Sequence, residues 1–390
     1  DAAILPGFVN AHTHLEYAVY AGFGDGQSFG PWIATHVERK QRLARGDMEA
    51  IARLGAAECL RSGVTTVGDL AFAGSSALAC AELGLRAIVY LEVFGDDPDD
   101  ARRQFEKKRA YVSGALSARV RVGVSPHAPY TCSTPVYEVA ADLGLPLATH
   151  LNESQDELDW LLRGEGAWQA FGSMLIDPDG QSGIRRLAGA GLLGPEVVAA
   201  HCVKVDAEEI ALLARHGVGV THCPRSNALL GCGVAPLDAL RRAGLRVGIG
   251  TDGVSSVPSH DFFDELRAVV AGARAREERA GALSATEALE LATLGGARAL
   301  GLEAEVGSLV PGKRADLAVL SLSGSPYLPW EDPAAAVVYG GAPGRIEATL
   351  VDGLTRYERG GFEWHELIDA ASAARGRMLR PGRTHASAQR

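Results

Sequence analysis

The chain has 390 residues, of which 47% are hydrophobic and 22% are charged, so it has a globular composition and can bury a substantial core. Its formal net charge of −10 is spread along the chain, which argues against nucleic acid as a partner because such a surface needs a basic patch. No segment approaches the ~20 apolar residues of a membrane helix, and none resembles a signal peptide. We therefore expect a cytoplasmic protein that contacts neither membrane nor nucleic acid.

Short apolar, β-branched runs alternate with helical patterns along most of the chain. The expected strands are 4–10, 65–70, 86–94, 119–125, 146–150, 197–201, 217–221 and 246–251. Helical patterns between them include 47–61, 135–143, 207–216 and 236–243. Apolar strands that alternate with amphipathic helices are typical of a parallel sheet covered by helices, and eight such units match an α/β fold of the (β/α)₈ TIM-type barrel class. We place the barrel at residues 4–305.

The pattern changes after the eighth strand. Helices are expected at 261–280 and 284–300, the second beginning with a capping box of Ser284 and Glu287. Short strands within 307–320 and 348–356 then predict a small flanking β-domain, which we place at 306–360. Residues 361–390 are expected to hold a C-terminal helix and a loose tail from about Arg375.

The cysteines give no sign of a disulfide framework. All six are scattered without a CxxC pair, which in a chain of this length favours free, mostly buried thiols in a reducing compartment. They are Cys59, Cys80, Cys132, Cys202, Cys223 and Cys232.

Metal-ligand residue types follow four of the predicted strands. His12 and His14 follow the first strand, where residues two apart face the same side, and His150, His201 and Asp252 end the fifth, sixth and eighth. In a (β/α)₈ barrel these ends share one mouth, and histidines with a carboxylate suit Zn²⁺ with water in the remaining position. A lone histidine at such a place is usually a hydrogen-bonded structural group, and Asp252 alone could begin a turn. The conjunction of all these strand ends favours a metal site.

Six short motifs resemble the amidohydrolase superfamily, in its cytosine deaminase and chlorohydrolase-like branch. They are PGFVNAHTHLE at 6–16, SPHAPYTCS at 125–133, THLNE at 149–153, AHCV at 200–203, CPRSN at 223–227 and GTDG at 250–253. The resemblance implies a hydrolase with one metal ion per chain, usually zinc and sometimes iron, and a small-molecule substrate. The implied ligands are His12, His14, His150 and Asp252.

The resemblance also implies a mechanism. Glu153 would be the proton shuttle, passing a water proton to a ring nitrogen, and His201 would orient the metal-bound hydroxide. Asp252 would help to hold that hydroxide; the alternative for Glu153 is a solvated surface carboxylate. Relatives with two metals carry a bridging lysine after the fourth strand, where this chain has Ser125-Pro126-His127, so a single metal is expected.

Relatives in this superfamily build the small β-domain from both ends of the chain. This sequence opens on Asp rather than Met and reaches a buried-looking strand by Ile4. We therefore expect that the N-terminal part of the small domain is missing. A homodimer is compatible with the sequence.

The substrate is predicted from the residues around the barrel mouth. Glu16 and the CPRSN motif resemble aminodeoxyfutalosine deaminases of the menaquinone pathway, whose substrate carries a benzoate. Arg225 is then expected to bind the carboxylate, unless it pairs with a neighbouring acid, and Asn227 of the same motif to bind substrate. Trp32 is expected to stack on base or ribose, or else simply to pack, and His127 to hydrogen-bond the purine.

The preferred hypothesis is thus a hydrolytic deaminase of an adenine-type nucleoside, with 6-aminodeoxyfutalosine as the expected substrate. One alternative is a methylthioadenosine, S-adenosylhomocysteine or adenosine deaminase, although the acid expected to grip the ribose is replaced near Gln41, with only Glu38 close by. A triazine-type chlorohydrolase, which releases chloride rather than ammonia, is a second alternative. A non-catalytic scaffold is a remote one, because no metal ligand is missing.

Overall fold

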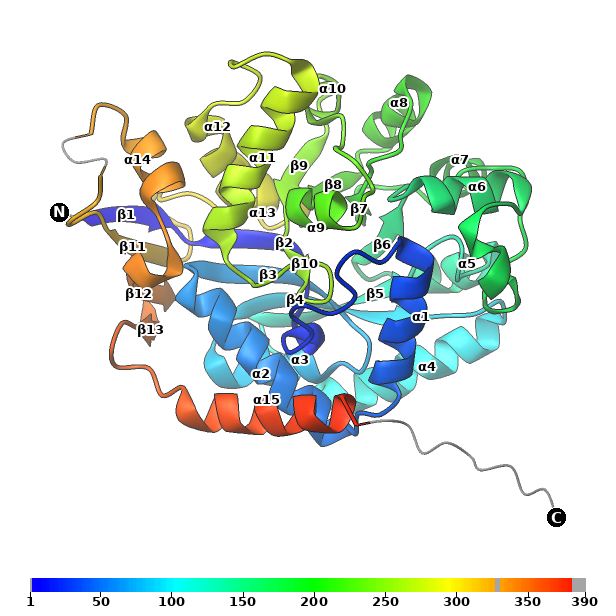
Figure 1. The fold of residues 1–390 in the computed structure, drawn as a ribbon, viewed down its shortest axis with the longest axis horizontal. Coiled ribbons are helices and arrows are strands. Elements are labelled where there is room, and N and C mark those ends of the chain that lie inside the picture. The colour runs from blue at the N-terminus through cyan, green and yellow to red at the C-terminus, as the bar shows by residue number, and fades with distance from the viewer. Residues whose placement is uncertain (1, 327–329, 381–390) are drawn as a thin grey trace.

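A ring of parallel strands forms the centre of the molecule (Figure 1). The computed structural model describes residues 2–326 and 330–380. The strand order is β10-β2-β3-β4-β5-β6-β7-β8-β9. The bounds are β2 Phe8–His14, β3 Val64–Ala71, β4 Arg86–Val93, β5 Val120–Pro126, β6 Leu147–Leu151, β7 Val197–His201, β8 Gly219–His222, β9 Arg246–Ile249 and β10 Asp252–Gly253. β9 pairs with β8, and β10 directly after it pairs with β2, which closes the ring. The predicted TIM-type barrel is confirmed.

Helices cover the outside of the ring, which explains why the strands are buried on both faces: every residue of β3 and β4 is buried. Between the barrel strands lie α1 Phe29–Lys40, α2 Arg45–Arg61, α3 Ser75–Leu83, α4 Pro98–Val112, α5 Thr134–Asp142, α6 Gln155–Arg163, α7 Gly183–Gly189, α8 Ala207–Arg215, α9 Pro224–Leu229 and α10 Leu237–Arg242. α11 Phe262–Glu277 follows the last strand. None of the described helices combines the length and apolar composition that crossing a membrane requires.

The helix expected at 284–300 closes the bottom of the barrel in three pieces. α12 (Ala285–Glu290) begins with the predicted capping box of Ser284 and Glu287, a π-helical turn spans Leu291–Gly295, and α13 (Gly296–Ala299) follows. Gly296 lies so close to β2 that a Cβ there would stand 2.7 Å from the Val9 carbonyl oxygen. This close approach brings the helix against the strand ends opposite the metal-ligand residues.

The strand expected at 4–10 is two strands, and this corrects the prediction. β1 (Ala2–Pro6) is half exposed and pairs antiparallel with β11 (Leu317–Ser321), whereas β2 is wholly buried in the barrel. Gly7 stands at the junction, where a Cβ would lie 2.2 Å from the Thr65 side chain. The chain therefore changes sheets at a residue that has no room for a side chain.

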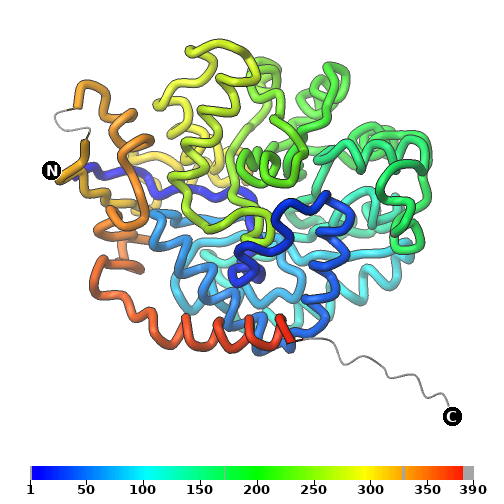
Figure 2. Tube along the Cα trace, viewed as in Figure 1, coloured from blue at the N-terminus to red at the C-terminus, as the bar shows by residue number. Residues whose placement is uncertain are grey.

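The small antiparallel sheet has the order β1-β11-β12-β13, so residues from both ends of the sequence build it (Figure 2). Its remaining elements are β12 Ile346–Val351 and β13 Leu354–Glu358, with α14 Pro333–Gly340 before them. α15 (His365–Met378) packs against α2, where Arg377 pairs with Asp47. Arg375, at which a loose tail was expected to begin, is helical; residues 381–390 lie outside the described residues.

Candidate metal centre and active site

Five side chains from four strand ends meet at the mouth of the barrel. β2 supplies His12 and His14, β6 supplies His150, β7 supplies His201, and β10 begins at Asp252. The Nε2 atoms of His12 and His14 each lie 3.4 Å from Asp252 Oδ1, and His14 Nε2 lies 3.3 Å from His150 Nε2. His201 and Asp252 adopt left-handed backbone conformations, with φ of 72° and 62°. Such strain at strand ends is typical of a functional site.

The histidine tautomers show that this cluster fits a cation. His14 Nδ1 is 2.8 Å from the Leu70 carbonyl oxygen, and His150 Nδ1 is 2.7 Å from that of His127. Carbonyl oxygens only accept hydrogen bonds, so both Nδ1 atoms carry the proton and both Nε2 atoms present lone pairs. His12 Nε2 is also buried and makes no hydrogen bond within the described part of the chain. Two Nε2 lone pairs, the Nε2 atom of His12 and a carboxylate oxygen thus converge, a donor set that suits a divalent ion such as zinc.

Hydrogen bonds prepare Asp252 to be a ligand. Ser226 and Ser256 donate to its Oδ2 at 2.6 and 2.8 Å, which leaves Oδ1 facing the histidines. Burial alone would raise the pKa of Asp252, but His12 and His14 hold it well below the usual range. Burial lowers the pKa of His150 to about 4. The aspartate is therefore ionised and the imidazole neutral, the forms that bind metal.

Glu153 lies beside this cluster, just beyond β6. Its Oε1 is 3.6 Å from His201 Nδ1, and the Asn227 amide donates to the same nitrogen at 3.0 Å. The Glu157 carboxylate accepts hydrogen bonds from the backbone N–H groups of Asn152 and Glu153, which fixes the segment that carries Glu153. Burial, followed by the nearby Asp252 charge, raises the pKa of Glu153 well above its usual range.

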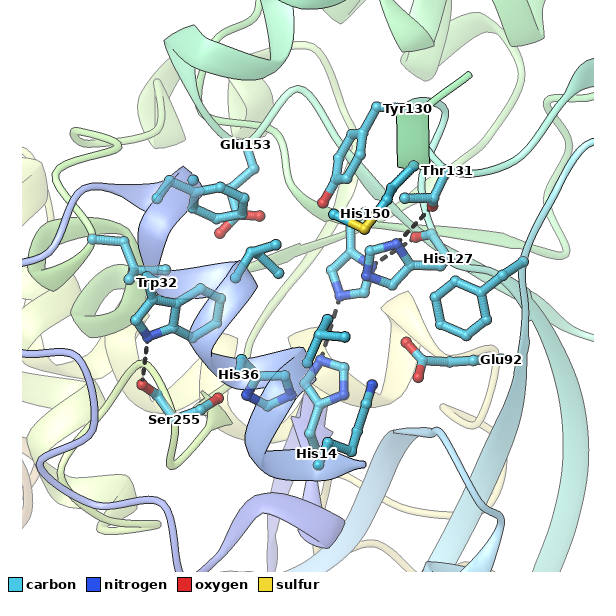
Figure 3. Close-up of a pocket in the computed structure, with 18 of the residues that line it drawn as sticks. His14, Trp32, His36, Glu92, His127, Tyr130, Thr131, His150, Glu153 and Ser255 are labelled. Atoms are coloured by element: carbon cyan, nitrogen blue, oxygen red, sulfur yellow. Dashed lines mark hydrogen bonds between the residues drawn. The ribbon is translucent and has the colours of Figure 1, made fainter. Parts of the chain in front are cut away.

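A cavity of about 240 Å³ opens above the metal-ligand residues (Figure 3). The aromatic residues of its wall include Phe29, Trp32, Tyr130 and Trp168. Trp32 donates its indole N–H to the Ser255 carbonyl oxygen at 3.0 Å, so its ring is held at the cavity edge. His127 also lines the cavity, with Nδ1 2.8 Å from Thr131 Oγ1. The size and apolar lining suit a planar aromatic ligand.

Three residues expected to bind substrate, Arg225, Glu16 and Asn227, are not among those that line this cavity; the Asn227 amide donates to His201 instead. Arg225 is not among the residues that line this cavity: its guanidinium pairs with the buried Glu265 and donates to the Ser259 carbonyl oxygen at 2.8 Å. The structure thus contains the alternative expected for Arg225, which is an ion pair with a neighbouring acid. Glu16 is also outside the cavity lining, because its carboxylate accepts from the backbone N–H groups of Ala73 and Ser75 at 2.7 and 2.6 Å. It caps the first turn of α3.

Several cavity residues were missed from the sequence. His36 and Lys40 follow the predicted Trp32 at intervals of four residues in α1, a spacing that places all three on one face of a helix. Glu92 was a second signal, since it is a carboxylate near the end of a strand whose other residues after Arg86 are hydrophobic. Tyr130 lies in a quoted motif but was not singled out.

Comparison with known proteins gives the family. A model of the amidohydrolase family matches residues 3–355. The chain belongs to the amidohydrolase family. The structure of an adenosine deaminase with bound zinc from Xanthomonas campestris superimposes on this amidohydrolase with a TM-score of 0.87 and 29% identity, over 97% of this chain and 86% of that one.

Curated relatives agree with that assignment. A 5-methylthioadenosine/S-adenosylhomocysteine deaminase of Symbiobacterium thermophilum is 36% identical over 367 residues, which are 91% of this chain and 81% of the relative. A 5'-deoxyadenosine deaminase of Methanothermobacter thermautotrophicus is 32% identical over 95% of this chain and 87% of the relative. An atrazine chlorohydrolase from Arthrobacter aurescens, at 22% identity and a TM-score of 0.82 over 96% of this chain and 88% of that one, shares the fold.

Proposed function

We propose that this amidohydrolase is a hydrolytic deaminase of an adenine-type nucleoside. The observation that carries the proposal is the placement of Glu153 beside the metal-ligand cluster, at the rim of an aromatic-walled cavity. Relatives at 32–36% identity act on adenine nucleosides modified at the 5' position, as their names state, and this supports a substrate of that class.

The residues supply the parts that hydrolytic deamination needs. A divalent ion held by His12, His14, His150 and Asp252 would lower the pKa of a bound water toward ~7 and supply hydroxide at neutral pH. Zinc is the ion that we propose, with one ion per chain, because three imidazoles and one carboxylate make up the donor set.

Glu153 is proposed to carry out the proton transfers. It can take a proton from the attacking water and give it to the ring nitrogen beside the reacting carbon. The Asn227 amide donates to His201 Nδ1, so the proton of neutral His201 lies on Nε2, where it can hydrogen-bond the reacting oxygen. Trp32 and His127 are proposed to position the base from the cavity wall.

The identity of the nucleoside is the finer part of the proposal. 5'-Deoxyadenosine, methylthioadenosine and S-adenosylhomocysteine fit the relatives. 6-Aminodeoxyfutalosine stays a candidate, but the carboxylate partner expected for it, Arg225, is occupied by Glu265. A cytoplasmic location and a homodimer stay predictions.

An ammonia-release screen tests the function. The purified, zinc-loaded protein is assayed with adenosine, 5'-deoxyadenosine, methylthioadenosine, S-adenosylhomocysteine, 6-aminodeoxyfutalosine, guanine and cytosine, and with a chlorotriazine by chloride release. We expect ammonia from one or more adenine nucleosides and little turnover of the others. Chloride release from the triazine without deamination of any adenine nucleoside would refute the proposal.

A further inference from the structure

A buried carboxylate lines the cavity on the side opposite Glu153. Glu92 lies near the end of β4, is 1% exposed, and its Oε2 makes no hydrogen bond within the residues that the structure describes. Figure 3 shows Glu92 and Glu153 on opposite sides of the histidines. Glu92 lies close enough to His127 and His150 for the three to offer ligand atoms within 4.8 Å of one another. Because His150 already belongs to the metal cluster, we do not assign a second ion to the group of Glu92, His127 and His150.

Lys40 brings a positive charge to the same part of the cavity. It is the last residue of α1, and its ammonium lies 3.6 Å from the centre of the Phe72 ring and 5.7 Å from that of Tyr17. Among the described residues it forms neither a hydrogen bond nor an ion pair within 4.0 Å, whereas neighbouring Lys108 donates to the Glu92 carbonyl oxygen at 2.6 Å. Burial lowers the pKa of Lys40 to about 8, and Glu92 opposes that shift.

Glu92 and Lys40 therefore line the same cavity without forming an ion pair with each other. A buried donor or acceptor left unpaired is costly, so a group that fills the space between them and pairs with both would bind well. That group must donate a hydrogen bond to Glu92 and accept one from Lys40. A neutral heterocycle with an amino group next to an unprotonated ring nitrogen has this pattern.

The proposed reaction, on which this inference rests, orients the base. If Glu153 serves the ring nitrogen N1 of an adenine, the other side of the reacting carbon carries the exocyclic amino group and, next to it, N7. We propose that Glu92 accepts a hydrogen bond from the exocyclic amino group and that Lys40 donates one to N7. The pair would thus recognise the edge of a 6-aminopurine that bears the leaving group.

This placement also selects the leaving group. In the reaction, a water oxygen forms a bond to the ring carbon and the C–N bond breaks. One water proton ends on N1 and the other leaves with the amino nitrogen, which departs as ammonia. That nitrogen gains positive charge as it is protonated, so the Glu92 carboxylate stabilises its departure. A departing chloride gains negative charge beside the same carboxylate and is disfavoured.

The test compares three substrates on the wild-type zinc enzyme: the best adenine nucleoside, its 6-chloropurine analogue, and its 7-deaza analogue, in which N7 is replaced by C–H. We expect the wild type to prefer the amino compound over both analogues. Turnover of the 7-deaza analogue as fast as the parent would overturn the role of Lys40. Equal turnover of the chloro analogue would overturn the role of Glu92.

Two variants make the test specific. Glu92→Gln should lower kcat/KM for the amino substrate by ~10- to 100-fold and kcat/KM for the chloro analogue much less. Lys40→Met should lower kcat/KM for the parent nucleoside by about tenfold or more and should hardly change kcat/KM for the 7-deaza analogue. The exposed Glu138→Gln and Lys107→Met are matched controls and should change neither ratio.

Equal losses on all substrates, with metal content unchanged, would mean that the pair only supports the cavity wall and would refute the inference. The wild-type comparison keeps this informative if a variant fails to fold. A wild type that deaminates no adenine nucleoside refutes the proposed function instead, so the two failures can be told apart.

Discussion

His14 and His150 face each other with 3.3 Å between their Nε2 atoms, and each has its proton on the opposite ring nitrogen. Two lone pairs at this separation repel each other unless a cation lies against both. The carbonyl oxygens of Leu70 and His127 enforce this arrangement, because each accepts from one Nδ1 atom. The backbone of β3 and the segment after β5 thus help to build the metal centre without supplying a ligand.

The first prediction concerns metal content. Elemental analysis of the purified protein should find one divalent ion per chain, and Asp252→Ala should bind it far more weakly, because the variant lacks the one anionic ligand. A chelator should lower Tm in the wild type, since an ion that binds only the folded state stabilises it by ~2.7 kcal/mol at a hundred times its Kd. The exposed His365→Gln is the control and should keep its ion. Two ions per chain, or activity without any, would contradict the site.

The second prediction concerns the proton shuttle. Glu153→Gln keeps the size of the side chain but cannot take up a proton, so turnover should fall by ~10²–10⁴. Metal content should stay at the wild-type level, because Glu153 is not one of the proposed ligands. Steady-state kinetics together with elemental analysis check both points, and Glu138→Gln on the exposed face of α5 is the control. Near-normal turnover would assign the shuttle to another residue.

The sequence was informative where function depends on strand ends. In a closed barrel the carboxyl ends of all strands meet, so His12, His14, His150, His201 and Asp252 could be expected in one mouth from the positions of apolar runs alone. Side chains whose partners come from distant segments could not be placed in this way. Glu16, for example, follows the HTHL motif directly, yet its partners are backbone N–H groups 57 and 59 residues away.

The first strands of the chain also could not be predicted correctly from the sequence alone. The segment 4–10 is mostly apolar on both sides of Pro6-Gly7, and the pairing of the strands is what separates the exposed strand β1 from the buried strand β2. The helix α1 shows the opposite case. Its spacing of Trp32, His36 and Lys40 was readable in the sequence, but only the barrel mouth behind the helix gives that face a function.

The third prediction concerns Arg225. Its partner Glu265 is wholly buried, so Arg225→Met leaves a carboxyl group without its countercharge. Burial raises the pKa of Glu265 to about 7, and the group can therefore take up a proton, which places the expected loss at the low end of the ~3–5 kcal/mol usual for a broken buried pair. Urea denaturation measures this loss, and Arg225→Met combined with Glu265→Gln should recover part of it. Arg103→Met, in an exposed ion pair, should change stability little.

The same variant separates the structural role of Arg225 from recognition of a substrate carboxylate. Because Arg225 does not line the cavity, any loss of kcat/KM should be equal for 6-aminodeoxyfutalosine and for substrates without a carboxylate. A loss confined to the carboxylate-bearing substrate would return Arg225 to the binding site.

The fourth prediction concerns the stability cost of Lys40. Its pKa is about 8 in the folded protein because of burial, against ~10.4 in an unfolded chain. Between these values the unfolded state binds more protons, so the stability of the wild type should rise with pH across that window relative to a variant without the amine. Lys40→Met should therefore be more stable than the wild type at pH 7, by on the order of 1–3 kcal/mol, and this advantage should shrink by pH 10.

Urea denaturation at both pH values, at equal metal content, measures the difference. The exposed Lys107→Met should show the same small difference at both. An advantage of Lys40→Met that does not change with pH would mean that Met merely packs better, and that Lys40 carries no charge that burial opposes.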